Sequence, residues 1–222
     1  MSLKNMTLEN IAKACNGIYI GDESLKQTEI TGVEKDSRLI EEGYLYLPFV
    51  GAKVDGHDFI PQVFEKGALC TLSEKKLDIN KPYILVKSVA DALKAIAEFY
   101  REQLSCKIIG ITGSVGKTSA KETIASVLGE RFNVGKTPGN LNNLIGLPLT
   151  CFTFDKNTEI AVVEMGVSEM GEMDHMTDIV KPDVAVITNI GVSHMENFGS
   201  REGIYNEKIK LANVLPEGGV AV

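Results

Sequence analysis

Gly110-Ile-Thr-Gly-Ser-Val-Gly-Lys-Thr-Ser119 is the stretch that decides the fold. It joins an apolar run, residues 107–112, which predicts a strand, to residues 117–129, which predict a helix. Glycines at such a turn let successive backbone N–H groups face a bound phosphate, and the start of the helix adds partial positive charge. The stretch therefore indicates a phosphate-binding loop.

The match to the general pattern G-x-x-x-x-G-K-[ST] is imperfect, because position 111 is Ile111 and the glycines stand at 110 and 113. An ordinary glycine-rich turn between strand and helix is the alternative. The Lys-Thr pair in register favours the phosphate loop, with Lys117 reaching the β and γ phosphates of ATP and Thr118 binding Mg²⁺. The expected nucleotide contacts are Gly113, Ser114, Val115, Gly116, Lys117, Thr118 and Ser119.

Strands and helices are expected to alternate after this loop. Apolar runs such as residues 183–187 are typical of strands buried on both faces of a parallel sheet. We expect a P-loop-type parallel-sheet domain over residues 106–222, incomplete at the C-terminus because no helix follows the last strand. Its further elements are predicted as strand 158–165, helix 171–180, strand 183–190, helix 201–214 and strand 219–222.

The first part of the chain predicts a small α/β domain over residues 1–105. Apolar residues recur at helical spacing at both ends of this region. Between them lie short apolar runs separated by Gly, Asp and Pro. The expected elements are helix 7–15, strands 44–47, 68–70 and 83–86, and helix 89–104.

Composition excludes several classes of protein. The formal net charge of -7 argues against a nucleic-acid partner. The four cysteines form no C-x-x-C pair, so we expect neither disulfides nor a zinc site, and a cytoplasmic location. No apolar run approaches the roughly 18 residues of a membrane span, so we expect no membrane insertion.

The phosphate loop resembles that of one family. The pattern T-G-x-x-G-K-[TS] occurs in the Mur ligases and their folylpolyglutamate synthetase relatives, and residues 112–118 fit it throughout. The family commonly has Asn where this chain has Val115. The resemblance implies an ATP-dependent, Mg²⁺-dependent ligase that forms amide bonds.

Two strand ends downstream carry polar residues that fit the family. Glu164 ends a buried strand and His194 follows the next one, and such side chains converge at the carboxyl edge of a parallel sheet. On its own, Glu164 could be a capped strand-end acid, and His194 depends mainly on the resemblance. The resemblance implies that both lie at a second Mg²⁺.

Lys208 follows His194 by fourteen residues, the offset at which Mur ligases carry a lysine carbamylated by carbon dioxide. Nearby Lys210 leaves open the alternative of a solvated lysine face. The resemblance thus assigns catalysis to Lys117, Glu164, His194 and Lys208, and metal binding to Thr118, Glu164, His194 and Lys208.

Two segments are expected to bind substrate. The run with Asn140, Asn142 and Asn143 resembles the loop of the family members that add D-alanyl-D-alanine, although a plain Asn-Gly turn is the alternative. Ser37 and Arg38 resemble the segment that grips the UDP end of the substrate, with a capped surface turn as the alternative.

The implied reaction joins D-alanyl-D-alanine to UDP-N-acetylmuramoyl-tripeptide through an acyl phosphate. Family chains are about twice as long and carry a third domain, so we expect this chain, as a monomer, to bind ligands without turnover. Another Mur-type amino-acid ligase and a non-ligating, ATP-dependent binding module remain alternatives.

Overall fold

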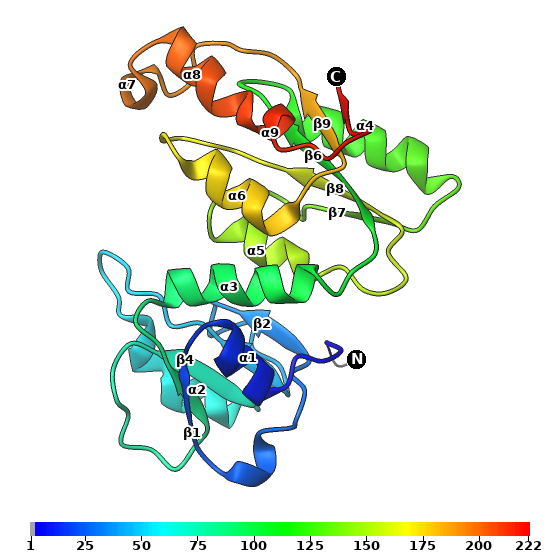
Figure 1. The fold of residues 1–222 in the computed structure, drawn as a ribbon. Coiled ribbons are helices and arrows are strands. Elements are labelled where there is room, and N and C mark those ends of the chain that lie inside the picture. Colours follow the sequence, from blue (N-terminus) through cyan, green and yellow to red (C-terminus); the bar gives the residue numbers. More distant parts are fainter. Residues whose placement is uncertain (1–2) are drawn as a thin grey trace. The chain divides into compact units, whose positions relative to one another are not determined.

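The structure, a computed structural model, describes residues 3–222 (Figure 1). The chain divides into two compact units, Met1–Tyr100 and Arg101–Val222, each with its own five-stranded sheet. The predicted α/β architecture with parallel sheets is confirmed. Within residues 3–222, no helix is both long and apolar enough to cross a membrane.

The sheet of the first unit has the order β1-β5-β4-β3-β2. Its strands β2 to β5 are parallel, and β1 pairs with β5 in the antiparallel direction. The parallel strands direct their carboxyl ends to one edge, from which the loops that could bind substrate emerge. The strands are β1 (Ile18–Ile20), β2 (Gly32–Glu34), β3 (Tyr44–Tyr46), β4 (Cys70–Ser73) and β5 (Tyr83–Leu85).

Helices pack against this first sheet. Thr7 caps the first of them, because its hydroxyl accepts a hydrogen bond from the Asn10 N–H. One buried cluster, which includes Tyr46, Ile60 and Val63, joins strand β3 to helix α2. The helical elements are α1 (Leu8–Ala14), η1 (Glu23–Leu25), η2 (Gly56–Phe59), α2 (Ile60–Glu65) and α3 (Val89–Arg101), the last residue of which opens the second unit.

The sheet of the second unit is wholly parallel, in the order β10-β9-β6-β8-β7. Strand β6 lies in the middle, and the strands that follow it pair first on one side of it and later on the other. Ligands bind outside the carboxyl ends of strands at such a reversal of strand order. The strands are β6 (Lys107–Thr112), β7 (Val134–Lys136), β8 (Ile160–Glu164), β9 (Val184–Ile187) and β10 (Val220–Ala221).

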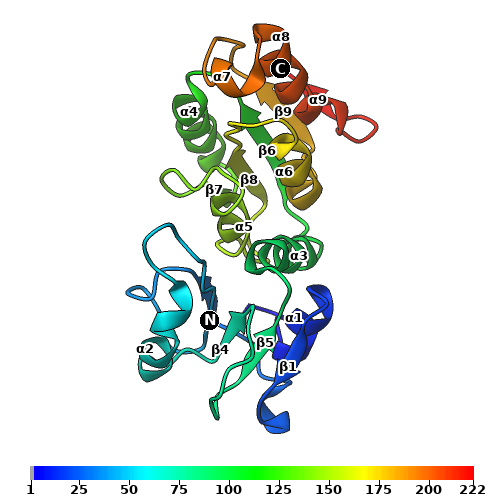
Figure 2. The same ribbon diagram turned by 90° about the vertical axis from the view of Figure 1, so that its left-hand side faces the viewer.

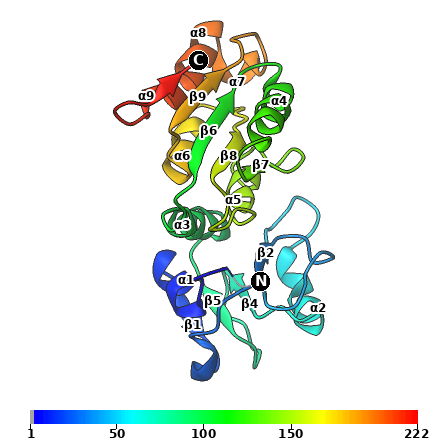
Figure 3. The same cartoon turned by 90° about the vertical axis from the view of Figure 1, so that its right-hand side faces the viewer.

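Helices cover both faces of this second sheet (Figures 2 and 3). Helix α4 packs on one face through a cluster that includes Ile111, Ala125 and Val162, and helices α6 and α9 lie on the other face. The helices are α4 (Lys117–Gly129), α5 (Gly146–Cys151), α6 (Glu172–Val180), α7 (Met195–Phe198), α8 (Arg201–Lys208) and α9 (Lys210–Asn213).

Several predicted elements need correction. Helix 201–214 is divided into α8 and α9 at Ile209, helix 89–104 ends at Arg101, and strand 68–70 begins only at Cys70. Strands β1, β2 and β7 and helices α2, α5 and α7 were not predicted. Helix α5 was missed because its sequence, Gly-Leu-Pro-Leu-Thr-Cys, contains two poor helix formers, yet all six residues are buried.

Candidate functional site

The phosphate loop lies at the carboxyl end of the central strand β6. Gly113 and Gly116 adopt backbone φ values of 146° and 86°, which residues with a Cβ rarely adopt. Helix α4 then begins at Lys117, and no side chain within residues 3–222 caps its first turn. The free N–H groups and the helix dipole therefore form a ready site for an anion.

The loop that follows β9 holds the phosphate loop in shape. The Asn189 amide accepts a hydrogen bond from the Val115 N–H and donates one to the Val115 carbonyl, both at 3.1 Å. Thr188 donates to the same carbonyl at 2.6 Å. The Val115 side chain, by contrast, is 66% exposed. Hydrogen bonds from the Thr188 and Asn189 side chains to the Val115 backbone therefore fix the loop at the position where the family commonly has Asn. The shape of the loop does not depend on the side chain at that position.

Glu164, at the end of β8, is buried beside the start of α4. Thr118 Oγ1 donates to its carboxylate, at 3.0 Å from Oε2 and 3.2 Å from Oε1. Asn142 Nδ2 donates to Oε1 at 2.8 Å. Thr118 and Asn142, which were predicted from separate segments, thus meet at the Glu164 carboxylate.

A small cavity of about 200 Å³ opens beside Asn142, the donor to this carboxylate, whereas Glu164 and Thr118 do not themselves line it. The residues that border it come from the phosphate loop, the loop that contains Asn142, the loop after β9 and the end of α8. His194 lies on its rim, exposed and with a left-handed φ of 57°. The lining comprises Gly113, Ser114, Lys117, Asn142, Gly166, Val167, Ser168, Ser193, His194 and Lys208.

Lys208 and Lys210 have different surroundings. Lys208 is 2% exposed and lines the cavity, and its ammonium has no hydrogen bond or ion pair to any of residues 3–222. Burial, together with the positive charge of Lys117, lowers the pKa of Lys208 from 10.5 to about 8, although the Glu207 carboxylate opposes this shift. Lys210 instead pairs with Asp174 and Glu207, each at 2.7 Å. Of the two lysines, Lys208 is therefore the one that faces the cavity.

The three asparagines of the predicted loop have different environments. Asn142 contacts Glu164, whereas the Asn143 side chain accepts hydrogen bonds from the N–H groups of Ile145 and Gly146 and so supports the start of α5. Asn140 is exposed. The structure brings only Asn142 into the cavity.

Sequence reasoning missed Lys121, which is 1% exposed and lies 3.7 Å from Glu164 Oε2. Its position four residues after Lys117 was the available signal, because residues at that spacing share one face of a helix. Thr137 was also missed. Its hydroxyl accepts a hydrogen bond from the Glu164 N–H at 2.9 Å.

The residues around Glu164 suit a magnesium ion. No group of three or more His, Cys, Asp or Glu side chains within residues 3–222 could hold a metal. Mg²⁺, however, prefers oxygen ligands and retains several waters, so one or two protein oxygens are sufficient beside nucleotide phosphates. The Thr118 hydroxyl and the Glu164 carboxylate provide such oxygens in direct contact.

Ser37 and Arg38 lie in the turn after β2, at the carboxyl edge of the first sheet. The Arg38 guanidinium binds Asp36 through Nε at 2.9 Å and Nη2 at 2.6 Å, and its side chain is 83% exposed. The hydrogen bonds from Arg38 hold the pKa of the Asp36 carboxyl well below its usual range. The turn therefore presents an oriented guanidinium to solvent.

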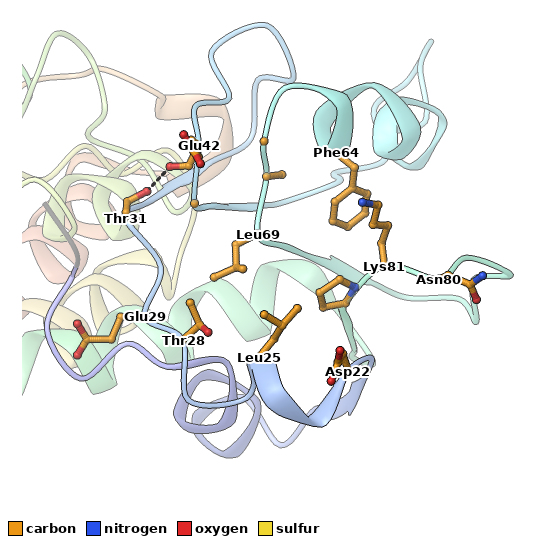
Figure 4. Close-up of a pocket in the computed structure, with 14 residues that line it drawn as sticks. Asp22, Leu25, Thr28, Glu29, Thr31, Glu42, Phe64, Leu69, Asn80 and Lys81 are labelled. Carbon is orange, nitrogen blue, oxygen red and sulfur yellow. Dashed lines mark hydrogen bonds between the residues drawn. The ribbon is translucent and has the colours of Figure 1, made fainter.

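The first unit also contains a cavity of about 720 Å³ (Figure 4). Residues that immediately precede the parallel strands line it, among them Thr31, Leu69 and Pro82, so it lies at the amino edge of the sheet. Thr31 donates a hydrogen bond to the Glu42 carbonyl at 2.6 Å on its wall. Ser37 lies at the opposite edge, and the two features are separate.

Two family models match the chain. The Mur ligase middle domain matches residues 111–222, and the catalytic domain of the Mur ligase family matches residues 29–103.

Curated relatives extend this likeness over almost the whole chain. The UDP-N-acetylmuramoyl-tripeptide–D-alanyl-D-alanine ligase of Bacillus subtilis is 44% identical over 97% of this chain and 48% of its own length. The enzyme of the same name from Escherichia coli is 34% identical over 98% of this chain and 47% of its own length. The chain thus spans about half the length of the curated relatives it matches.

Solved structures agree. A crystal structure of MurF from Acinetobacter baumannii is 35% identical and covers 100% of this chain and 49% of its own, with a TM-score of 0.92. MurF from Thermotoga maritima, in complex with ADP, is 36% identical over 86% of this chain and 44% of its own, with a TM-score of 0.79. Because the middle-domain model alone matches half of the sequence, the chain belongs to the Mur ligase family.

Proposed function

We propose that the protein is part of an ATP-dependent ligase that joins D-alanyl-D-alanine to UDP-N-acetylmuramoyl-tripeptide in peptidoglycan precursor synthesis. The observation that carries this proposal is the meeting of the phosphate loop, the Thr118–Glu164 pair and the buried Lys208 at one edge of the second sheet. The relatives that bear this name, similar over almost the whole chain, support the choice of substrates.

The roles of the residues follow from their positions. The N–H groups at the start of α4 and the Lys117 ammonium would bind the phosphates of ATP and neutralise developing charge. Thr118, Glu164, His194 and Lys208 would hold magnesium, Lys208 through the carboxylate oxygens of its carbamylated form. When bound, ATP and magnesium supply a phosphoryl group that turns a carboxylate, a poor electrophile at neutral pH, into a reactive acyl phosphate.

The first unit would bind the UDP end of the substrate. Arg38 is held by Asp36 so that its exposed fork can meet a diphosphate, with Ser37 beside it. Asn142 would fix the geometry of Glu164 and offer its amide to the peptide. Four free cysteines agree with a cytoplasmic location.

Ligand-induced thermal shifts of the chain test the proposal. Binding to the native state at 100 times Kd stabilises it by about 2.7 kcal/mol. We expect shifts with ATP plus magnesium and with UDP-N-acetylmuramoyl-tripeptide, the latter larger than with UDP. AMP is the control, because it lacks the β and γ phosphates that Lys117 would reach. A shift with ATP but with neither uridine ligand would favour a binding module or a different ligase.

Reconstitution tests the reaction itself. The chain is mixed with the C-terminal half of the Bacillus subtilis relative, and formation of ADP and of the ligated peptide is measured. Product that requires both pieces supports the ligase. Nucleotide binding without any product would favour the binding module.

The buried Lys208 should lower stability in a pH-dependent way. Because its folded pKa of about 8 lies below the unfolded value of 10.5, the energetic penalty is fully present below pH 8 and disappears as the pH rises to 10.5. We expect Lys208→Met to be more stable than the original chain at pH 7, by up to about 3 kcal/mol, and the difference to vanish near pH 10.5. Urea unfolding of both proteins in buffer free of carbon dioxide measures this difference.

The same lowered pKa leaves part of the Lys208 amine neutral near pH 8, which is the form that attacks carbon dioxide. A ¹³C-labelled bicarbonate solution should give a carbamate NMR signal that Lys208→Met lacks and Lys210→Met retains. A signal that disappears only with Lys210→Met would move the modification to the other lysine.

A further inference from the structure

Lys121 has no role in the function as described so far, yet it is one of the most deeply buried charged groups of the second unit. It lies on α4, and its side chain is 1% exposed. Lysine is almost never fully buried unless its charge is paired, because removing an ammonium from water is costly. The partners of this ammonium should therefore indicate why it is there.

The Lys121 ammonium contacts four acceptors on three elements. It donates to the carbonyl oxygens of Thr137 at 3.0 Å and Gly139 at 3.4 Å, in the loop between β7 and α5. It also lies 3.2 Å from Glu122 Oε1 on its own helix and 3.7 Å from Glu164 Oε2 at the end of β8. One ammonium thus ties the helix of the phosphate loop to residues 137–143 and to the buried carboxylate.

Further hydrogen bonds carry this connection to the cavity. The Glu164 N–H donates to Thr137 Oγ1 at 2.9 Å, and the Gly166 N–H donates to the Asn142 carbonyl at 2.7 Å. Asn142 in turn donates its side-chain amide to Glu164. The loop and the end of the strand therefore hold each other, and Lys121 is the only cation that contacts both within residues 3–222.

We propose that Lys121 is a positioning residue of the magnesium-dependent nucleotide site, whose ammonium fixes Glu164 and the loop of residues 137–143 against α4 before the nucleotide binds. The inference rests on the proposed function, because it assigns Glu164 to magnesium. Removal of a group that binds and orients a metal ligand, without itself touching the metal, typically lowers metal affinity by about 10–100-fold. A lysine that only supported the fold would change stability without a magnesium-specific effect.

The test compares Lys121→Met and Lys121→Gln with the original chain. Lys136→Met is the matched control, because Lys136 pairs with the same Glu122 but is 47% exposed and does not contact Glu164. ATP affinity is measured by calorimetry with magnesium and with EDTA. Lys121→Gln keeps a hydrogen-bond donor and so provides a folded variant if Lys121→Met unfolds.

We expect the magnesium enhancement of ATP affinity to fall about tenfold in both Lys121 variants, with the affinity in EDTA unchanged within about twofold. Hydrogen exchange at the Glu164 and Gly166 N–H groups should become faster in both variants and remain unchanged in Lys136→Met. An unchanged magnesium enhancement, or an equal loss with magnesium and with EDTA, would overturn the inference alone. An original chain that binds no ATP would overturn the proposed function, and this inference with it.

Discussion

Gly113→Ala is expected to destabilise the second unit by about 2 to 6 kcal/mol, the sum of overpacking and backbone strain. The added Cβ would lie 2.0 Å from Thr188 Oγ1, far inside contact distance, and the φ of 146° is unfavourable for alanine. Since Thr188 also holds the Val115 carbonyl, the phosphate loop would be displaced. Urea unfolding measures the loss, and calorimetry should show ATP binding weakened along with it.

Gly129→Ala is the matched control, because a Cβ there meets nothing within 4 Å. It lies at the end of α4, where alanine should be neutral or stabilise by up to about 1 kcal/mol. The cost of Gly113→Ala should also be smaller in a Thr188→Ala background, which removes the oxygen that clashes. If Gly113→Ala were as stable as Gly129→Ala, the close approach of the two loops would be wrong.

Arg101→Ala is expected to lower the free energy of unfolding by about 3 to 5 kcal/mol, because it leaves several buried carbonyls without a donor. Its guanidinium is buried and donates to the carbonyl oxygens of Val180 at 3.0 Å, Leu104 at 2.9 Å and Cys106 at 3.3 Å. Val180 ends helix α6, where a positive charge also offsets the helix dipole. Thermal and urea unfolding measure the loss.

Arg131→Ala is the control for this substitution. Arg131 is exposed on the same unit and lies over the Phe132 ring, so its removal should cost less than about 1 kcal/mol. Arg101→Lys should give an intermediate loss, because one ammonium replaces only part of the three-way contact. Equal effects of the two alanine substitutions would show that the Arg101 hydrogen bonds contribute little.

The strongest local signals in the sequence predicted their elements well. Strand β6 and helix α4 have the predicted bounds, because an unbroken apolar run and a glycine turn define both ends locally. Strand β7 and helix α5, between residues 129 and 158, were missed. Strand β7 has three residues with a central glycine, and helix α5 has six that include Gly and Pro, so neither carries a local preference. Pairing with β8 stabilises the strand, and burial of all six residues stabilises the helix.

The candidate site shows the same division. The phosphate loop was predicted, as were the positions of Glu164 and His194 relative to their strands. Local runs of apolar residues show where each strand ends, and the order of the segments follows directly from the sequence. The family resemblance favoured Lys208 over Lys210, but the residues themselves left both open, because both lie at the end of one helical segment. Only packing buries the first and pairs the second. The same holds for Asn142, which contacts Glu164, and Asn143, which supports a helix.

The sequence by itself therefore determined the fold class, the family resemblance and the segments that carry the chemistry. These depend on short-range patterns of apolar residues, glycines and the Lys117-Thr118 pair. The tertiary structure alone decided which side chain of each segment meets Glu164, and it revealed Lys121 at 1% exposure between a loop and a strand end. Burial and charge pairing arise from contacts between residues distant in the chain, and no local pattern encodes them.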